Sequence, residues 1–208
     1  MLKPEAMREN APRIVDVFSQ IARPIMRQFM DASSCIASAR CTIEVMKLFQ
    51  LRSQEIPVAF ALQVPARKYA RISGWTEEQR AEMRKTAASY QDLPIKGWNG
   101  HLLVLVENRW VIDPSIDQAD APEFGVSIPP EVFTFSTQGN KWNPFDQFEM
   151  QLGLTLDNGD QASLMYRRIE NTEYLETEAW NDEGLPALAK AIAVQMAIKE
   201  MGDKVRFV

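Results

Sequence analysis

A predicted β-hairpin restricts the possible folds of this chain more than any other segment. His101, the only histidine in the sequence, opens one apolar run, and a second apolar run leads from Trp110 to Asp113. Two such runs around a short polar segment are typical of antiparallel strands. If residues 107–109 form a three-residue turn, His101 and Asp113 share one face as diagonal neighbours, roughly 7–8 Å apart between backbones. A two-residue turn would put the carboxylate on the opposite face.

A cysteine precedes this hairpin at the expected start of a helix. Ser34 is a suitable N-cap for a helix from Cys35 to about Leu51, where apolar residues recur with helical spacing. The first turn of a helix has unpaired N–H groups and the positive end of the macrodipole, which favour a negatively charged sulfur and can bind an oxyanion. If Cys35 meets His101 and Asp113 in space, they form a nucleophile, a base and an orienting group for acyl transfer.

Each of these residues also has a structural interpretation. Cys35 can be a small buried apolar side chain, His101 a packed histidine, and Asp113 the polar end of a strand before a proline. For Cys41, which lies in the middle of the helix, we expect only the structural role. The two cysteines are separated by roughly 9 Å along a helix axis, so we do not expect a disulfide between them. The order of the three elements in the chain favours the catalytic interpretation.

Hydrophobic periodicity and turn signals predict the remaining elements. We expect helices at 11–31, 75–90 and 183–201, a buried strand at 56–64, and a hairpin of strands 148–156 and 161–168. Pro24 should kink or split the first helix, and Thr76 with Gln79 fits a capping box at the start of the second. Residues 117–147 should form a long surface loop, which either walls the cleft or packs on its own aromatic side chains, among them Phe124, Phe133, Phe135 and Trp142.

The composition limits the class of protein. With 208 residues, 46% of them apolar, the chain fits a single domain (1–208) with a core at about 30–118 and a C-terminal hairpin and helix at 148–201. A net charge of −5 argues against nucleic acid as a partner, because duplex binding requires a basic face. Neither a cofactor nor a metal is expected, since the chain has no glycine-rich phosphate loop and no zinc-site spacing of cysteine and histidine.

The protein is expected to be cytoplasmic and not bound to a membrane. The segment Met1–Glu5 lacks the apolar core of a signal peptide. The longest apolar runs, such as Ile56–Leu62, are far too short to span a bilayer. Two unpaired thiols suit a reducing compartment.

Three short motifs occur together around the reactive residues. Ser34–Cys35 opens a helix, Gly100–Val104 begins a histidine-led strand, and Trp110–Pro114 has the pattern aromatic-x-x-Asp-Pro. With the strand at Ile56–Val58, these motifs resemble the transglutaminase-like branch of the papain-like cysteine enzyme superfamily over about residues 30–118. The resemblance implies an α+β fold, papain-like or transglutaminase-like, in which N-terminal helices include a nucleophile helix packed on an antiparallel β-sheet.

By this resemblance Cys35 is the nucleophile, His101 is the base and acid, and Asp113 is the orienting group. The side chains that precede the cysteine or the histidine and are candidates for oxyanion donors are Gln28, Trp98 and Asn99. The implied activity is cysteine-dependent acyl transfer or amide hydrolysis on a peptide or protein amide, as in a protease, an amidase, a protein cross-linker or an acetyltransferase. The alternative is a catalytically inactive transglutaminase-like fold that acts as a protein-binding module.

Overall fold

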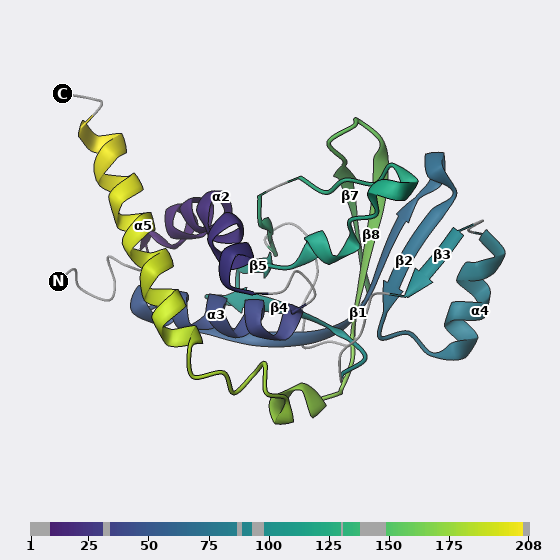
Figure 1. Ribbon diagram of the computed structural model, residues 1–208, viewed down its shortest axis with the longest axis horizontal. Helices are drawn as coiled ribbons and strands as arrows, with labels where there is room; N and C mark the ends of the chain where they lie inside the picture. Colours follow the sequence, from purple (N-terminus) through teal and green to yellow (C-terminus); the bar gives the residue numbers. More distant parts are fainter. Residues whose placement is uncertain are drawn as a thin grey trace.

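The computed structural model describes residues 9–30, 34–86, 89–92, 98–129, 131–137 and 149–205. The α-helices are α2 (Ala11–Phe29), α3 (Cys35–Leu48), α4 (Glu77–Thr86) and α5 (Leu185–Val205). Helices α2, α3 and α5 gather at one end of this α+β fold, and α4 lies at the other end beyond the sheet (Figure 1). The segment that becomes the cysteine helix therefore packs in a helical layer against one end of the sheet.

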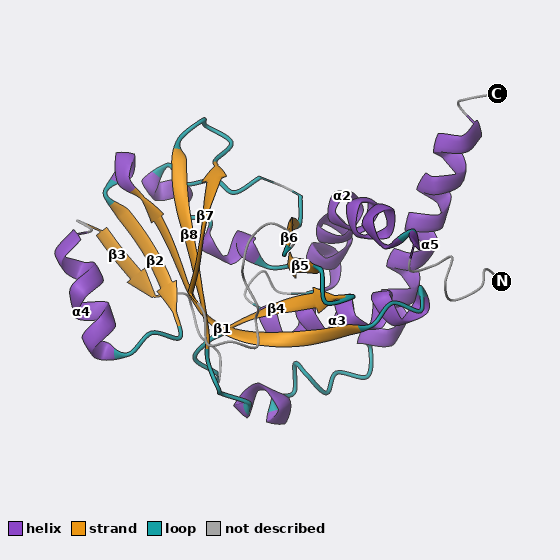
Figure 2. Cartoon of the chain, turned by 180° about the vertical axis from the view of Figure 1, so that it is seen from behind, coloured by secondary structure: helices purple, strands orange, loops and turns teal. Residues whose placement is uncertain are grey.

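Eight strands in the described part of the chain form one curled sheet (Figure 2). Its order is β3-β2-β1-β4-β5-β6, and β8 pairs with both β1 and β7. All pairs are antiparallel except β2 with β3. The strands are β1 (Ser53–Val64), β2 (Tyr69–Ser73), β3 (Ser89–Asp92), β4 (His101–Val106), β5 (Trp110–Asp113), β6 (Phe133–Ser136), β7 (Glu149–Thr155) and β8 (Gln161–Arg168).

Strand β1 is the centre of the sheet, because one of its edges changes partner halfway along. On that edge residues 53–58 pair with β4 and residues 60–64 pair with β2, while the opposite edge pairs with β8. Strand β2 therefore ends, and β4 begins, at the same point of β1, next to Ala59. There the Ser73 hydroxyl donates a hydrogen bond of 2.8 Å to the Gly100 carbonyl, which ties the two strand ends together.

Glycine is required at this junction. Gly74 follows β2 with a φ of +76°, and a Cβ at this position would lie 2.9 Å from the Cα of Ala59 and 3.3 Å from the Cα of Gly100. Both the left-handed backbone and the close contact exclude a larger side chain without strain. The close contact brings the two strand ends together on β1 and so fixes the point at which His101 starts β4.

Strand β4 faces apolar clusters on both sides of the sheet. Leu102 packs in a cluster that contains residues of α2, α3 and α5, and Leu103 packs in the cluster on the other face. All residues of β4 are buried, as its continuous apolar sequence predicts. His101 shares the face of Leu103 by alternation, and its ring lies 5.0 Å from that of Phe60, between centroids. The imidazole is thus built into the core.

Several expected elements are confirmed. The predicted C-terminal hairpin is present as β7 and β8, which pair in register along their whole length. In the capping box of α4, the Thr76 N–H donates to the Gln79 side chain at 2.9 Å, and the Gln79 N–H lies 3.4 Å from the Thr76 hydroxyl. The expected C-terminal helix is present as α5, which buries Leu185, Leu188, Ile192 and Met196.

Of the two effects expected of Pro24, a kink or a split, the split does not occur. Helix α2 continues through Pro24 from Ala11 to Phe29. A proline removes one helical hydrogen bond, but α2 buries Phe18 before the proline and Met26 after it. Tertiary packing on both sides of the proline therefore stabilises a single helix.

The expected helix at 75–90 is shorter, and its last residues belong to a strand. Helix α4 ends at Thr86, and β3 pairs in parallel with β2, a strand that the sequence analysis did not predict. A polar four-residue segment such as Ser89–Asp92 has little strand preference of its own. Its structure follows from pairing with β2, which local periodicity does not indicate.

The described part of residues 117–147 does not form the expected surface loop. It contains two 3-10 helices, η2 (Ile116–Ala119) and η3 (Pro122–Phe124), and the strand β6, which pairs with β5. Five of its apolar residues are buried, namely Ala119, Ala121, Val126, Ile128 and Val132. These short elements are stabilised by contact with the sheet. The local composition, rich in proline and aromatic residues, therefore does not indicate them. Trp142 lies outside the described residues.

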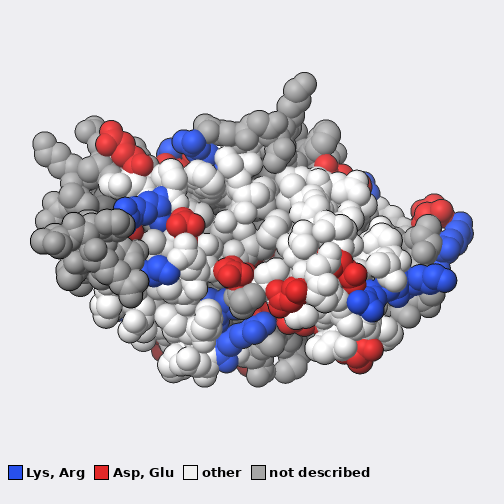
Figure 3. Space-filling view, turned by 90° about the horizontal axis from the view of Figure 1, so that it is seen from above, with Lys and Arg blue, Asp and Glu red and all other residues white. Residues whose placement is uncertain are grey.

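The molecular surface in Figure 3 shows Lys and Arg side chains interspersed with Asp and Glu side chains and with uncharged residues. Among the described helices, none combines the length and the apolar character that crossing a bilayer requires.

Candidate active site

Cys35 is the first residue of α3, as the sequence predicts. The Ser34 hydroxyl caps the helix by accepting a hydrogen bond of 3.1 Å from the Ala37 N–H. A side chain at this position lies beside the N–H groups of the first helical turn, which stabilise negative charge. Cys35 is 7% exposed, so it lies at the edge of the core.

His101 and Asp113 meet across the hairpin of β4 and β5. The register pairs Val106 with Trp110, so the turn has three residues, as predicted. The Nε2 atom of His101 lies 2.8 Å from Oδ2 of Asp113, and both residues are fully buried. The pairing of the imidazole with the carboxylate is therefore confirmed as a contact, together with the turn length that it requires.

The turn that sets this register is held by contacts between the Glu107 side chain and Arg52, which lies outside the hairpin. Glu107 and Asn108 have left-handed backbones, with φ of 51° and 52°. The Glu107 carboxylate accepts a hydrogen bond of 2.7 Å from the Arg52 N–H and pairs with the Arg52 guanidinium at 3.0 Å. A non-glycine residue rarely adopts this conformation without support, so the contact with Arg52 stabilises the turn.

The Asp113 carboxylate has two further hydrogen bonds. The Tyr166 hydroxyl donates to Oδ2 at 2.8 Å, and the Ser115 N–H donates to Oδ1 at 3.1 Å. Burial and the neighbouring carboxylate raise the pKa of Tyr166 well above its ordinary value, so the phenol remains a donor. Tyr166 was not among the candidate residues. Alternation along β8 indicates that it is buried, but the pairing of β8 with β1 that brings it to Asp113 has no local signal in the sequence.

The charge of His101 is set by opposing effects. Burial lowers its pKa, whereas the charge and the hydrogen bond of Asp113 raise it, with a further increase from Cys35; the resulting pKa is about 10. The imidazole is therefore protonated at neutral pH. A protonated ring donates from Nε2 to Asp113 and has a second N–H at Nδ1.

Cys35 is the other reactive group near this ring. The sulfur raises the pKa of His101, although Nδ1 has no hydrogen-bond partner of ordinary geometry among the described residues. The sulfur is thus within electrostatic reach of the imidazole but not tightly bonded to it. The structure assembles the three predicted residues from α3, β4 and β5, with Tyr166 added from β8.

Comparisons with protein-family models, curated proteins and solved structures gave no match. The chemistry of the site is therefore inferred from its own residues.

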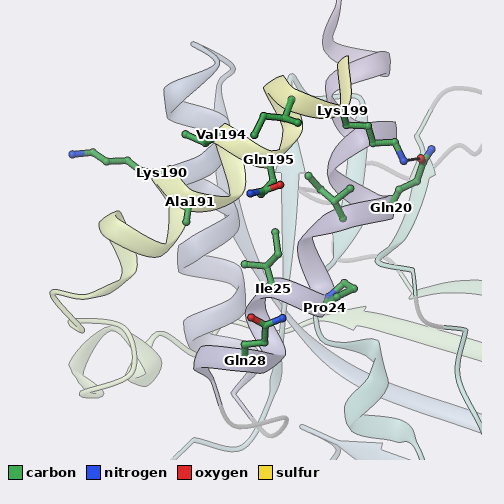
Figure 4. A pocket seen from close by; sticks show the side chains of 11 residues that line it. Gln20, Pro24, Ile25, Gln28, Lys190, Ala191, Val194, Gln195 and Lys199 are labelled. Atoms are coloured by element: carbon green, nitrogen blue, oxygen red, sulfur yellow. Dashed lines mark hydrogen bonds between the residues drawn. The ribbon is translucent and has the colours of Figure 1, made fainter. Parts of the chain in front are cut away.

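Gln28 lies apart from the three reactive residues. It is on the exposed side of α2 and lines a groove against α5, a cavity of about 860 Å³. Figure 4 shows Gln28 beside Ile25 at one end of this groove, with Lys190 and Lys199 on α5. No contact in the described part of the chain joins Gln28 to Cys35, so Gln28 is not favoured as an oxyanion donor.

Trp98 and Asn99 differ in their surroundings. The Asn99 side-chain oxygen accepts from the Gly74 N–H at 2.8 Å and from Arg80 at 3.4 Å, so it holds the strand junction together. The Trp98 indole is buried in the same apolar cluster as Cys35, and its N–H has no hydrogen-bond partner among the described residues. Of the three candidates, only Trp98 is a buried donor without a partner.

The second cysteine is chemically distinct from the first. Cys41 is fully buried within α3, and burial, together with Glu44, raises its pKa to about 12. Both cysteines are free thiols. Within the described ranges, no group of histidine, cysteine and carboxylate side chains is arranged to hold a metal ion.

The aromatic residues of 117–147 separate into two groups. Phe133 pairs with Asp113 in the β5–β6 register, and the Phe135 ring lies 6.4 Å from the Tyr166 ring, between centroids. Phe124 instead contacts Tyr69, at 5.0 Å between centroids. Two of the four expected aromatic residues thus lie beside the carboxylate of the site.

Proposed function

We propose that this protein is a cysteine-dependent acyl-transfer enzyme with a transglutaminase-like or papain-like arrangement, acting on a peptide or protein amide. Cys35 is the nucleophile, His101 the acid and base, and Asp113 the orienting group. The observation that carries the proposal is the buried hydrogen bond of 2.8 Å between His101 and Asp113, with Cys35 acting on the same imidazole from a helix N-terminus. An acid, a nucleophile and an orienting carboxylate are the components that such catalysis requires.

In the first step the Cys35 thiolate attacks the substrate carbonyl carbon. The oxyanion of the tetrahedral intermediate is stabilised by N–H groups of the first turn of α3, and the Trp98 indole N–H is a candidate second donor. The imidazolium of His101 protonates the leaving amine, the bond from carbon to the leaving group breaks, and a thioester on Cys35 remains. Because Asp113 favours the protonated ring, His101 begins the cycle as the acid.

In the second step neutral His101 accepts a proton from the attacking molecule. Water as the attacking molecule releases a carboxylic acid, and an amine releases a new amide. In both cases the carbon–sulfur bond breaks and the thiolate is restored beside the protonated ring. The Tyr166 and Ser115 hydrogen bonds hold the Asp113 carboxylate still during this exchange.

A protein-binding module without catalysis is the second candidate. The observation that favours it is burial, since Cys35 is only 7% exposed and the other two residues are not exposed at all. A buried imidazolium–carboxylate pair can also be a structural contact. The two candidates differ in the reactivity that they predict for the Cys35 sulfur.

Alkylation with iodoacetamide at pH 6 tests the proposal, with the labelled residue located by mass spectrometry. A free thiol is almost entirely protonated at this pH, so we expect Cys35 to react at least roughly tenfold faster than N-acetylcysteine. Cys41 is the internal control and should stay unlabelled in the folded protein. p-Nitrophenyl acetate should acetylate Cys35 in the wild type and not in C35A. If Cys35 reacts no faster than N-acetylcysteine and is not acetylated, the enzyme proposal fails.

A further inference from the structure

A small cavity is lined by residues that lie close in the chain to Cys35 and to Asp113. It has a volume of about 10 Å³, room for about one oxygen atom. Ser38, one helical turn after Cys35, lines it, and Pro114 and Ser115, which follow Asp113 directly, form another wall. Its remaining wall is formed by three charged side chains and two apolar ones, namely Arg23, Arg27, Asp117, Met26 and Met30. Residues on two sides of the cavity are therefore neighbours of the reactive groups.

Arg23 presents two unused donors in this wall. The residue is 2% exposed, and its Nη1 group donates to the Pro129 carbonyl. Its Nε and Nη2 groups have no hydrogen-bond partner among the described residues. These two groups form one edge of the guanidinium, the edge that binds carboxylate oxygens. The Ser115 hydroxyl, also 2% exposed, has no partner either, and buried donors of this kind cost free energy unless they are paired.

The neighbouring arginine shows what this edge can bind. Arg27 directs its Nε and Nη2 groups to one oxygen of Asp117, at 2.8 Å and 2.7 Å. The other oxygen of Asp117 lies 3.9 Å from Nε of Arg23, too far for a hydrogen bond. Asp120 lies 3.5 Å from Arg27 and adds to the charge that faces that side chain. Arg23 and Arg27 thus differ in exposure and in pairing. Arg27 is exposed and its edge is filled by Asp117, whereas Arg23 is buried and its edge has no hydrogen-bond partner among the described residues.

We propose that the open edge of Arg23, with the Ser115 hydroxyl, is a carboxylate-binding subsite of the acyl-transfer site. It rests on the function proposed above and narrows the substrate class to acyl donors or acceptors that carry a carboxylate near the reacting carbonyl. One carboxylate oxygen enters the cavity and accepts from Nε and Nη2, as Asp117 does for Arg27. Arg27, whose side chain is 44% exposed, lies beside the entering group.

Matched alkylating probes test this subsite. Iodoacetate and iodoacetamide form the first pair: both carry the same electrophile, and only iodoacetate has a carboxylate. In the second pair, N-iodoacetylglycine and its neutral amide, the carboxylate lies further from the reacting carbon. The rate of Cys35 labelling is measured for each probe relative to N-acetylcysteine. In the wild type we expect one anionic probe to label Cys35 about tenfold faster than its neutral partner, which is the effect of a charge-assisted contact.

Arginine-to-lysine substitutions separate the subsite from general attraction by positive charge. R23K keeps the charge but loses the two-donor edge, so the gain should disappear while labelling by the neutral probes persists. R27K is the matched control, because its edge is filled by Asp117, and it should keep most of the gain. S115A retains the backbone N–H to Asp113 and should reduce the gain about threefold; it decides the question if R23K does not fold, as judged by circular dichroism.

The outcomes distinguish the two proposals. If the neutral probes label Cys35 no faster than N-acetylcysteine, the acyl-transfer function fails and the subsite fails with it. If the neutral probes react rapidly but the carboxylate brings no gain, or the gain persists in folded R23K, the subsite is overturned and the acyl-transfer function stands. If R23K and R27K lose the same share of the anionic probe's rate gain, the subsite is also overturned, since the gain would then come from the combined positive charge of both arginines. If R23K does not fold, an unchanged gain in S115A has the same meaning.

Discussion

Tyr166 and His101 share a single oxygen of Asp113, and each lies 2.8 Å from Oδ2. The phenol comes from β8 and the imidazole from β4, and each strand is paired with β1. The carboxylate is thus held from two strands that have no direct connection in the chain. A carboxylate fixed in this way can orient the imidazole without moving itself.

Removal of the Tyr166 hydroxyl should weaken this orientation without breaking the site. We expect Y166F to slow Cys35 acetylation by about three- to tenfold and to lower the free energy of unfolding by about 1–2 kcal/mol, because one hydrogen bond to a charged group is lost. Stopped-flow acetylation and urea unfolding measure the two effects. Y69F is the matched control, since the Tyr69 hydroxyl is buried and has no hydrogen-bond partner in the part of the chain that the structure describes. Equal rates in Y166F and the wild type would contradict a positioning role.

The free energy of unfolding should fall as the pH rises from about 6.5 to about 10. The folded-state pKa of His101, about 10, lies above the value of about 6.5 in an unfolded chain. Its contribution is therefore complete below pH 6.5 and is lost as the pH rises through 10, because only the folded state holds the proton in this range. The loss should be on the order of a few kcal/mol. Urea unfolding of wild type and H101N across this range tests it, and an equally steep decline in H101N would count against the assignment.

The two cysteines should respond oppositely to substitution. C41A removes a fully buried side chain and should lower the free energy of unfolding by about 1–2 kcal/mol, while Cys35 labelling at pH 6 stays unchanged. C35A should abolish labelling at pH 6 with a smaller loss of stability. Mass spectrometry of labelled protein and thermal unfolding provide the two measurements. Labelling of Cys41 before unfolding would show that the buried thiol is more accessible than the structure indicates.

The strand junction at Gly74 should tolerate no larger residue. G74A puts a Cβ 2.9 Å from the Ala59 backbone at a positive φ, so we expect a loss of about 1–3 kcal/mol in the free energy of unfolding. G153A is the matched control, because a Cβ there meets no atom of the described residues within 4 Å, and it should change stability by less than about 0.5 kcal/mol. The G74A variant should also slow Cys35 labelling, since the junction sets the start of β4. Similar stabilities for both variants would contradict this account.

The sequence predicts the part of the site that depends on local spacing. The turn of residues 107–109 fixes the face of Asp113 relative to His101, and alternation along two strands is sufficient to pair them. The N-cap at Ser34 likewise fixes the helical position of Cys35. These relationships hold over short stretches of chain, where periodicity and turn chemistry decide the geometry.

The remaining features depend on contacts between distant segments. The three partners of β1 cannot be inferred from its apolar sequence, so the role of Tyr166 on β8 has no local signal. The strand character of residues 89–92 likewise depends on their pairing with β2. Pro24 indicates a helix break that packing overrides. The pairing of Arg23 also depends on distant segments, because the amino-acid order does not show that the Arg27 guanidinium binds Asp117 while Nε and Nη2 of Arg23 have no hydrogen-bond partner among the described residues.

The pairing of β8 with β1 also affects how the protein is made. Val58 faces Arg168 in this register, but α3 and β4 precede β8 in the chain and are therefore synthesised before it. Until then the Asp113 carboxylate lacks one of its donors and one edge of β1 is unpaired. A nascent chain would therefore lack the Tyr166 hydrogen bond to Asp113 until translation has passed the C-terminal hairpin.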